Sequence, residues 1–188
     1  MARIVLVNDG NLMPIKRLII KLCETSDIKD DKILIKDIKE CVDYISCNII
    51  VLNTTNPGLY LTKAMDRMAD GGAVILNSDE KNISGLRLHK PVKLITYGLN
   101  LKSTVTVSSI DMNERISLQC CIQRSFEDLS GNLLEPQEFQ VSSRDISLSV
   151  HDVLAAVTVS LLCGASVKDF AVWPALLSGS IGDISSDC

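Results

Sequence analysis

The chain has 188 residues, of which 46% are hydrophobic and 22% are charged, and its formal net charge is −4. This length accommodates one α/β domain with a buried core, and the negative charge argues against a general binder of nucleic acids or of anionic membranes. Aromatic residues make up only 4% of the sequence, so aliphatic residues fill the core, which suits a buried sheet covered by helices.

The amino-terminal half alternates between short apolar runs and helical patterns. Residues 3–7 predict a strand, and Pro14 then stands in the first turn of a helix whose apolar residues recur at helical spacing. A second helix is expected from Asn56 to a stop at residues 71–72. Further short strands are expected at residues 33–35, 48–52, 73–76 and 92–96. This alternation predicts a mostly parallel sheet.

The pattern changes after Gly98. Three segments alternate polar and apolar residues and predict a small antiparallel meander with one wet face, at residues 104–112, 115–122 and 138–141. Ser149 and Asp152 have the spacing of a capping box, so a helix with one buried stripe is expected to begin there and end at Gly164. A last helix is expected at residues 167–177.

The predicted fold class is therefore α/β, with three layers. Its mostly parallel sheet is Rossmann-like or P-loop-NTPase-like and carries the small antiparallel β meander. We expect residues 1–188 to form a single domain with a Gly/Ser-rich tail from about residue 178.

Several stretches occur in a fixed order along the chain. Residues 73–80 read Ala-Val-Ile-Leu-Asn-Ser-Asp-Glu, residues 93–98 form the next apolar run, and residues 152–164 contain an Ala-rich helical pattern. Asn53 and Thr54 follow an earlier apolar run. In series, these stretches resemble the central ATPase domain of the Mur ligases and of the related folylpolyglutamate synthetases. The resemblance implies that fold, and in an active member it implies ATP-dependent amide ligation.

The family's phosphate-binding loop, Gly-Thr-Asn-Gly-Lys-Thr-Thr, has no intact counterpart here. The corresponding positions are Asp9, Gly10, Asn11, Leu12, Met13 and Pro14. Such a loop needs glycines for close backbone approach, a lysine for the phosphates and a hydroxyl for Mg²⁺. Leu12 stands at the glycine, Met13 at the lysine and Pro14 at the hydroxyl, while Asp9 adds negative charge. The resemblance therefore predicts a degenerate loop, and we do not expect ATP binding.

Other positions depart from the family's pattern as well. Leu148 and Ser149 stand where the family has His-Asn facing the adenine, and Asp183 replaces the arginine of a Gly-x-x-Gly-Arg turn. His151 is displaced from the adenine position, so we expect it to be a solvent-exposed residue near a helix N-terminus. The family's amino-acid-binding and UDP-sugar-binding domains have no counterpart in these 188 residues.

Few other residues suggest chemistry. Asp79 and Glu80 are adjacent acids, a pairing that can hold Mg²⁺, but a solvated turn is the favoured interpretation. Cys120 and Cys121 lie on an alternating strand, so one should face inward and one outward. Trp173 is expected to pack in the core, with a partner contact as the alternative. Seven cysteines without a CxxC pair predict reduced thiols and no metal site.

These observations favour a non-catalytic Mur-ligase-like domain without a cofactor. We expect it to lie in the cytosol and to bind a protein partner or itself. Two alternatives remain open. The chain is a subunit of a split ligase that a partner completes, or it binds a small ligand in the crevice at the carboxyl ends of the parallel strands. In the second case, the crevice-lining residues would be Asn8, Asn53, Asn77 and Asp79.

Overall fold

A computed structural model describes residues 1–8, 10–29, 33–37, 46–83, 86–113, 115–143 and 148–170. Its centre is an eight-stranded sheet in the order β10-β7-β6-β5-β4-β3-β1-β2. The strands of this sheet are β1 (Ala2–Asn8), β2 (Ile33–Asp37), β3 (Cys47–Asn53), β4 (Met68–Asn77), β5 (Lys93–Tyr97), β6 (Val105–Asp111), β7 (Ile116–Ile122) and β10 (Gln137–Ser143). A separate two-stranded pair consists of β8 (Phe126–Glu127) and β9 (Leu133–Leu134).

The sheet is mostly parallel, as predicted. Strands β2, β1, β3, β4, β5 and β6 pair in parallel, whereas β7 and β10 add antiparallel pairings at one edge. The predicted meander corresponds to β6, β7 and β10. It continues the main sheet, because Tyr97 of β5 pairs with Val105 of β6. The solvated face of these strands is visible in β7, whose residues alternate strictly between buried and partly exposed.

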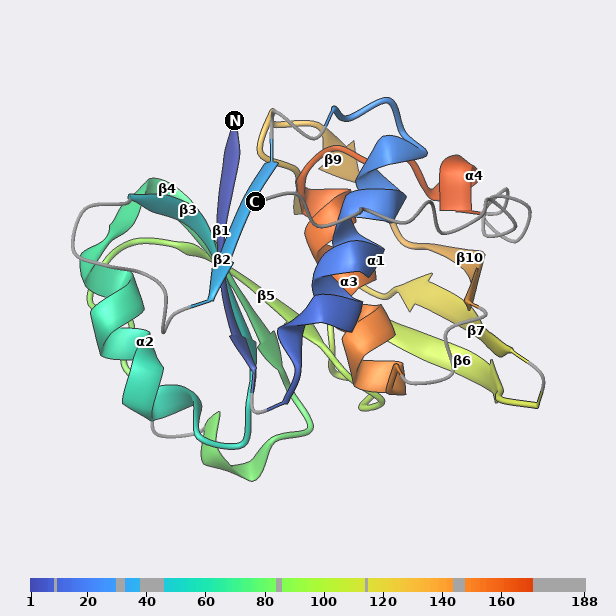
Figure 1. Ribbon diagram of the computed structural model, residues 1–188, viewed down its shortest axis with the longest axis horizontal. Helices are drawn as coiled ribbons and strands as arrows, with labels where there is room; N and C mark the ends of the chain where they lie inside the picture. The colour runs from blue at the N-terminus through green and yellow to red at the C-terminus, as the bar shows by residue number, and fades with distance from the viewer. Residues whose placement is uncertain are drawn as a thin grey trace, which may run out of the picture.

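Helices cover both faces of the parallel strands and complete the three layers (Figure 1). Helices α1 (Leu12–Glu24) and α3 (Val150–Leu162) pack on one face, and α2 (Pro57–Asp66) packs on the other. Each face therefore has its own hydrophobic cluster. Two short helical segments, η2 (Lys81–Ile83) and α4 (Val167–Phe170), complete the described elements. No described helix combines the length and the apolarity that crossing a bilayer requires.

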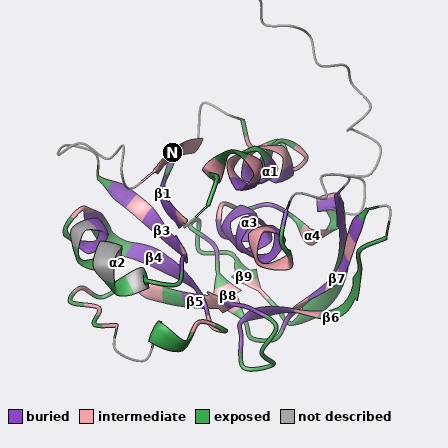
Figure 2. Cartoon of the chain, turned by 60° about the horizontal axis from the view of Figure 1, so that its bottom comes forward, coloured by how far each residue is buried: buried purple, intermediate pink, exposed green. Residues whose placement is uncertain are grey.

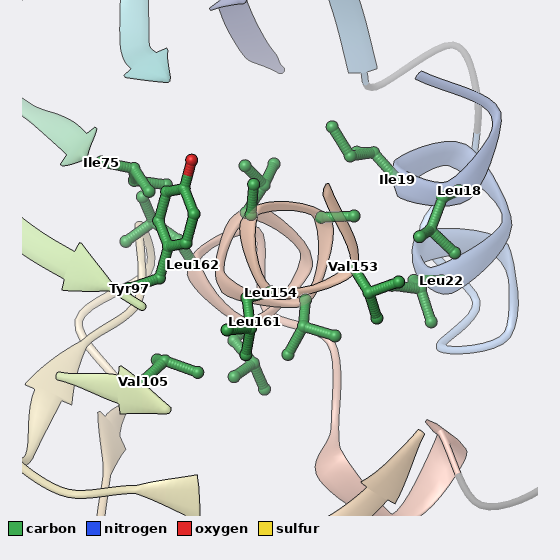
Figure 3. Close-up of a cluster of buried hydrophobic side chains, with 14 of the residues drawn as sticks. Leu18, Ile19, Leu22, Ile75, Tyr97, Val105, Val153, Leu154, Leu161 and Leu162 are labelled. Carbon is green, nitrogen blue, oxygen red and sulfur yellow. The ribbon is translucent and has the colours of Figure 1, made fainter. Parts of the chain in front are cut away.

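Helix α3 is buried on every side, so the prediction of a single buried stripe is wrong. All residues from Val153 to Leu162 are buried, as Figure 2 shows by colour. The reason is that α3 lies between the sheet and α1, a position that only a helix apolar all round can occupy. The hydroxyl groups of Thr158 and Ser160 donate to carbonyls one turn back, at 2.7 and 2.8 Å, and are thereby satisfied. Figure 3 shows α3 flanked by side chains of α1 and of the sheet, namely Leu18, Ile19, Leu22, Ile75, Tyr97 and Val105.

The predicted end of the second helix is also wrong. Helix α2 begins after Asn56 as expected, but it ends at Asp66, and β4 already begins at Met68. Gly71 and Gly72 lie within β4, close to a register shift against β3. A side chain on Gly72 would collide with Met68 and with the backbone of β3, so this glycine permits a close approach and does not end a helix.

The carboxyl-terminal prediction is tested only in part. Helix α4 begins at Val167, the predicted start of the last helix. The rest of that predicted helix, including Trp173, lies outside the described residues, as do Asp183 and the tail.

Candidate functional site

A cleft of about 520 Å³ opens at the carboxyl ends of β1, β3 and β4. The N-terminal ends of α1 and α3 border it, and in Figure 1 these helix ends lie to the right of the lower ends of the parallel strands. Ligands of open parallel sheets bind at this edge, and pockets for small molecules measure roughly 300–1,000 Å³. The cleft thus has the place and the size of a ligand site.

Three asparagines form a row along the floor of the cleft. Asn8, Asn53 and Asn77 are the last residues of β1, β3 and β4, and all three line the cleft. Asn8 pairs with Asn53 in register, and the residues before Asn53 and Asn77 pair with each other. The structure therefore brings together three of the four residues that the sequence suggested for the crevice. The fourth, Asp79, is not among the described residues that line the cleft.

A hydrogen-bond network fixes the central asparagine. The Asn53 amide Nδ2 donates to Asn8 Oδ1 at 3.0 Å and to Asp152 Oδ1 at 2.8 Å, while its Oδ1 accepts from the Tyr97 hydroxyl at 2.8 Å. Tyr97 is fully buried, and this burial, together with the nearby Asp152 carboxylate, raises its pKa well above the ordinary value. The phenol therefore stays protonated and remains a donor.

The N-terminus of α1 is capped by its own side chain. The side chain of the N-cap residue Asn11 accepts a hydrogen bond from the Met13 N–H at 3.0 Å, and Pro14, the third helical residue, has no N–H to offer. Gly10, Asn11 and Pro14 line the cleft, and Asp9 lies outside the described residues. An anion at this helix end would find few available backbone donors.

The N-terminus of α3 is also capped by its own side chains, and the predicted capping box is confirmed. Ser149 Oγ accepts from the Asp152 N–H at 3.1 Å, and Asp152 Oδ2 accepts from the Ser149 N–H at 2.9 Å. Ser149, His151 and Asp152 all line the cleft. The sequence identified Asp152 as a cap but gave no sign that its second oxygen binds Asn53, because the two residues lie 99 positions apart.

His151 and Asp79 form a pair that the sequence did not predict. His151 Nε2 lies 2.9 Å from Asp79 Oδ2, and the two side chains are 32% and 25% exposed. The Asp79 carboxylate also accepts from the N–H groups of Leu99 and Asn100, at 2.6 and 3.1 Å. Asp79 thus lies in an exposed turn and His151 is partly exposed in the first turn of α3, as expected, but the sequence did not predict that the two side chains pair. The reason is the turn at Gly98, whose φ of +154° presents two backbone donors to Asp79.

These contacts set the charge of Asp79. Its partial burial acts to raise its pKa, but the hydrogen bonds from Leu99, His151 and Asn100 outweigh burial and hold the pKa below the ordinary value. The carboxylate thus stays ionised at neutral pH and orients the imidazole of His151 at the edge of the cleft.

The electrostatic character of the cleft is acidic. None of the described residues that line it is a lysine or an arginine, whereas Glu80 and Asp152 contribute carboxylates. Lys16, two residues after Pro14 in the sequence, is not among the described residues of the lining. Within the described ranges, no group of three or more His, Cys, Asp or Glu residues is placed to hold a metal ion.

The adjacent cysteines lie away from the cleft and behave as the alternation predicted. Cys120 is buried and Cys121 is partly exposed. Burial raises the pKa of Cys120 to about 12, which makes this thiol unreactive at neutral pH.

Comparisons with known proteins support the fold. No protein-family model and no curated protein matches the sequence. Solved structures do match. The UDP-N-acetylmuramoylalanyl-D-glutamyl-2,6-diaminopimelate–D-alanyl-D-alanyl ligase of Acinetobacter baumannii aligns with 90% of this chain and 44% of its own, at 10% identity and a TM-score of 0.64.

Two further structures give the same picture. MurF of Acinetobacter baumannii aligns at 9% identity and a TM-score of 0.60, covering 90% of this chain and 44% of its own. The murein peptide ligase Mpl of Psychrobacter arcticus 273-4 aligns at 10% identity and a TM-score of 0.55, with 90% and 45% covered. The chain therefore has a Mur-ligase-like α/β fold, and it spans less than half the length of these ligases.

Proposed function

We propose that this chain is a non-catalytic Mur-ligase-like domain with a degenerate phosphate-binding loop, and that it acts as a binding or scaffold protein. Its partner is a second protein or another copy of the chain, and it does not use ATP. The observation that carries this proposal is the cleft, which lacks any lining lysine or arginine among the described residues and contains the carboxylates of Glu80 and Asp152.

The charge of the cleft opposes a nucleoside triphosphate. Phosphate sites place cations and unused backbone N–H groups around the anion. Here, the side chains of Glu80 and Asp152 would face the phosphates instead. Like charges that share a partly buried site repel more strongly than they do in water. Met13, at the position of the family's lysine, is an exposed apolar side chain with 48% of its surface accessible.

The two helix ends at the cleft support the same proposal. Each end uses its own side chain to satisfy its first amides, Asn11 in α1 and Ser149 in α3. A phosphate would have to displace these caps, and Pro14 removes a further donor. Binding ATP would therefore cost cap interactions without supplying the cation that normally compensates for the charge.

Isothermal titration calorimetry of the full chain with ATP and Mg²⁺ tests the proposal. We expect no binding up to millimolar ATP. The absence of a lining cation, the two carboxylates and the capped helix ends all oppose it. Micromolar binding of ATP to the wild-type chain would refute the proposal. Circular dichroism verifies that the protein used in the titration is folded.

Affinity capture from the native cell tests the binding role. Recovery of a chain with an intact phosphate loop, at fixed stoichiometry, would support the split-ligase alternative instead. Recovery of an unrelated partner or of a second copy supports the binding role.

A further inference from the structure

The lining of the cleft contains an amide N–H₂ group for which the described residues offer no acceptor. Asn77 is only 5% exposed, and its Oδ1 accepts the Asp79 N–H at 3.0 Å. This bond fixes the orientation of the amide, because the reverse orientation would place two donors against each other. Among the described residues, none accepts a hydrogen bond from Asn77 Nδ2. Asn77 Nδ2 is not among the fully buried polar atoms left without a partner, so this donor opens onto the cleft, where a ligand or water can accept from it.

A second amide in the same row has the same property. Asn8 Oδ1 accepts from Asn53, which fixes the Asn8 amide and leaves its Nδ2 without an acceptor in the described part of the chain. Asn8 and Asn77 lie on either side of Asn53 along the strand ends. The cleft therefore presents two oriented N–H₂ groups, which recognise acceptor oxygens such as carbonyls.

A carboxylate lies on the same turn as Asn77. The Glu80 N–H donates to the Asn77 carbonyl at 3.4 Å, and the Glu80 side chain lines the cleft. No described residue pairs with this carboxylate. The oxygens of Asp152, by contrast, are already occupied by Asn53 and Ser149. Glu80 is thus the acid that is available to a ligand, and the lining offers no cation to compete for it.

We propose that the cleft binds a primary amine that also carries carbonyl oxygens, the chemistry of a peptide amino terminus. The ammonium group lies at the Glu80 carboxylate, and the carbonyl oxygens accept from Nδ2 of Asn77 and Asn8. This inference rests on the proposed function, because a domain that bound ATP would fill the same cleft with phosphate.

The test compares three probes of similar shape by calorimetry: glycylglycinamide, which is cationic; N-acetylglycylglycinamide, which is neutral; and N-acetylglycylglycine, which is anionic. We expect glycylglycinamide to bind with a Kd in the millimolar range or tighter, and the neutral and anionic probes to bind about tenfold more weakly or not at all. Added salt should weaken the binding of the cationic probe.

Two variants locate the site. Glu80→Gln keeps the shape of the side chain and removes its charge, so it should weaken glycylglycinamide binding about tenfold. Glu135→Gln, which removes an exposed carboxylate outside the cleft lining, should leave binding unchanged. Equal binding of the cationic and neutral probes, or unchanged binding in Glu80→Gln, would overturn the inference. So would the absence of binding up to about 10 mM probe.

An ATP titration in the same series separates the two proposals. If ATP binds and displaces the probe, the proposed function fails. If neither ATP nor any probe binds, the proposed function stands and only the amine inference fails. A five-residue peptide with a free amino terminus distinguishes the sources of the ligand: tighter binding than glycylglycinamide assigns it to a protein terminus, and weaker binding assigns it to a small metabolite.

Discussion

Replacing Asn53 by alanine should destabilise the fold, because this side chain joins four parts of the structure. Its amide makes three side-chain hydrogen bonds, to Asn8, Asp152 and Tyr97. Together the three bonds contribute about 2 kcal/mol net, and a buried phenol left without its strong acceptor adds about 1 kcal/mol. The phenol keeps only a 3.4 Å contact to the Leu52 carbonyl. We expect a loss of about 3 kcal/mol in the free energy of unfolding.

Urea denaturation followed by circular dichroism measures this loss. In a domain of this size, about 3 kcal/mol corresponds to a decrease in Tm of roughly 6–12 °C, and the slope of the urea transition should not change. Asn113→Ala is the control, because among the described residues this exposed asparagine bonds only to Asp111, within its own turn. It should change the free energy of unfolding by less than about 0.5 kcal/mol.

A double-mutant cycle gives the sharper test of the network. Tyr97→Phe removes the donor that meets Asn53, so the two substitutions should be coupled by more than about 0.5 kcal/mol. Additive effects, or an Asn53→Ala loss smaller than about 1 kcal/mol, would show that the hydrogen bonds at the strand ends do not hold the cleft together.

Three further changes probe the rest of the structure. Gly98→Ala would press a methyl group against the Asp79 carboxylate at a positive φ, so it should destabilise the fold by about 1–3 kcal/mol. Thermal melts should show a smaller loss for Gly131→Ala, because no atom lies close to the added methyl group there. Folding lowers the pKa of Asp79, so its contribution to stability is present above the unfolded pKa and is lost as the pH falls through the folded one. The difference in unfolding free energy between wild type and Asp79→Asn should therefore shrink from about pH 6 to about pH 3, and a constant difference would argue against a lowered pKa. Iodoacetamide at pH 8 should modify Cys121 and spare Cys120 in the native protein, as read by tandem mass spectrometry; equal labelling would contradict the burial of Cys120.

The sequence predicted those features that depend on residues close together in the chain. The capping box at Ser149 and Asp152 located the start of α3, because both partners lie within one turn. The asparagines at residues 8, 53 and 77 were found because each ends an apolar run, and parallel strands end at one edge of a sheet.

The errors and omissions came from contacts between residues far apart in the chain, which leave no pattern in a short segment of sequence. His151 and Asp79 lie 72 positions apart, and only the turn after Gly98 makes Asp79 an anchor for both the turn and the imidazole. Met68 fits the helical spacing of α2, but its place in β4 follows from the pairing of Cys47 with Met68. The helix or strand propensity of a short segment does not decide the conformation of such residues, because their pairing with a distant strand does.

The position of α3 has a consequence for the order in which the protein forms during synthesis. Helix α1 is made near the beginning of the chain, yet it packs against α3, which is made near the end of the described residues. Until α3 leaves the ribosome, the apolar face of α1 and the facing side of the parallel strands have nothing between them. A nascent chain would therefore expose this apolar surface until α3 has been made, and the first core to close would be the one under α2.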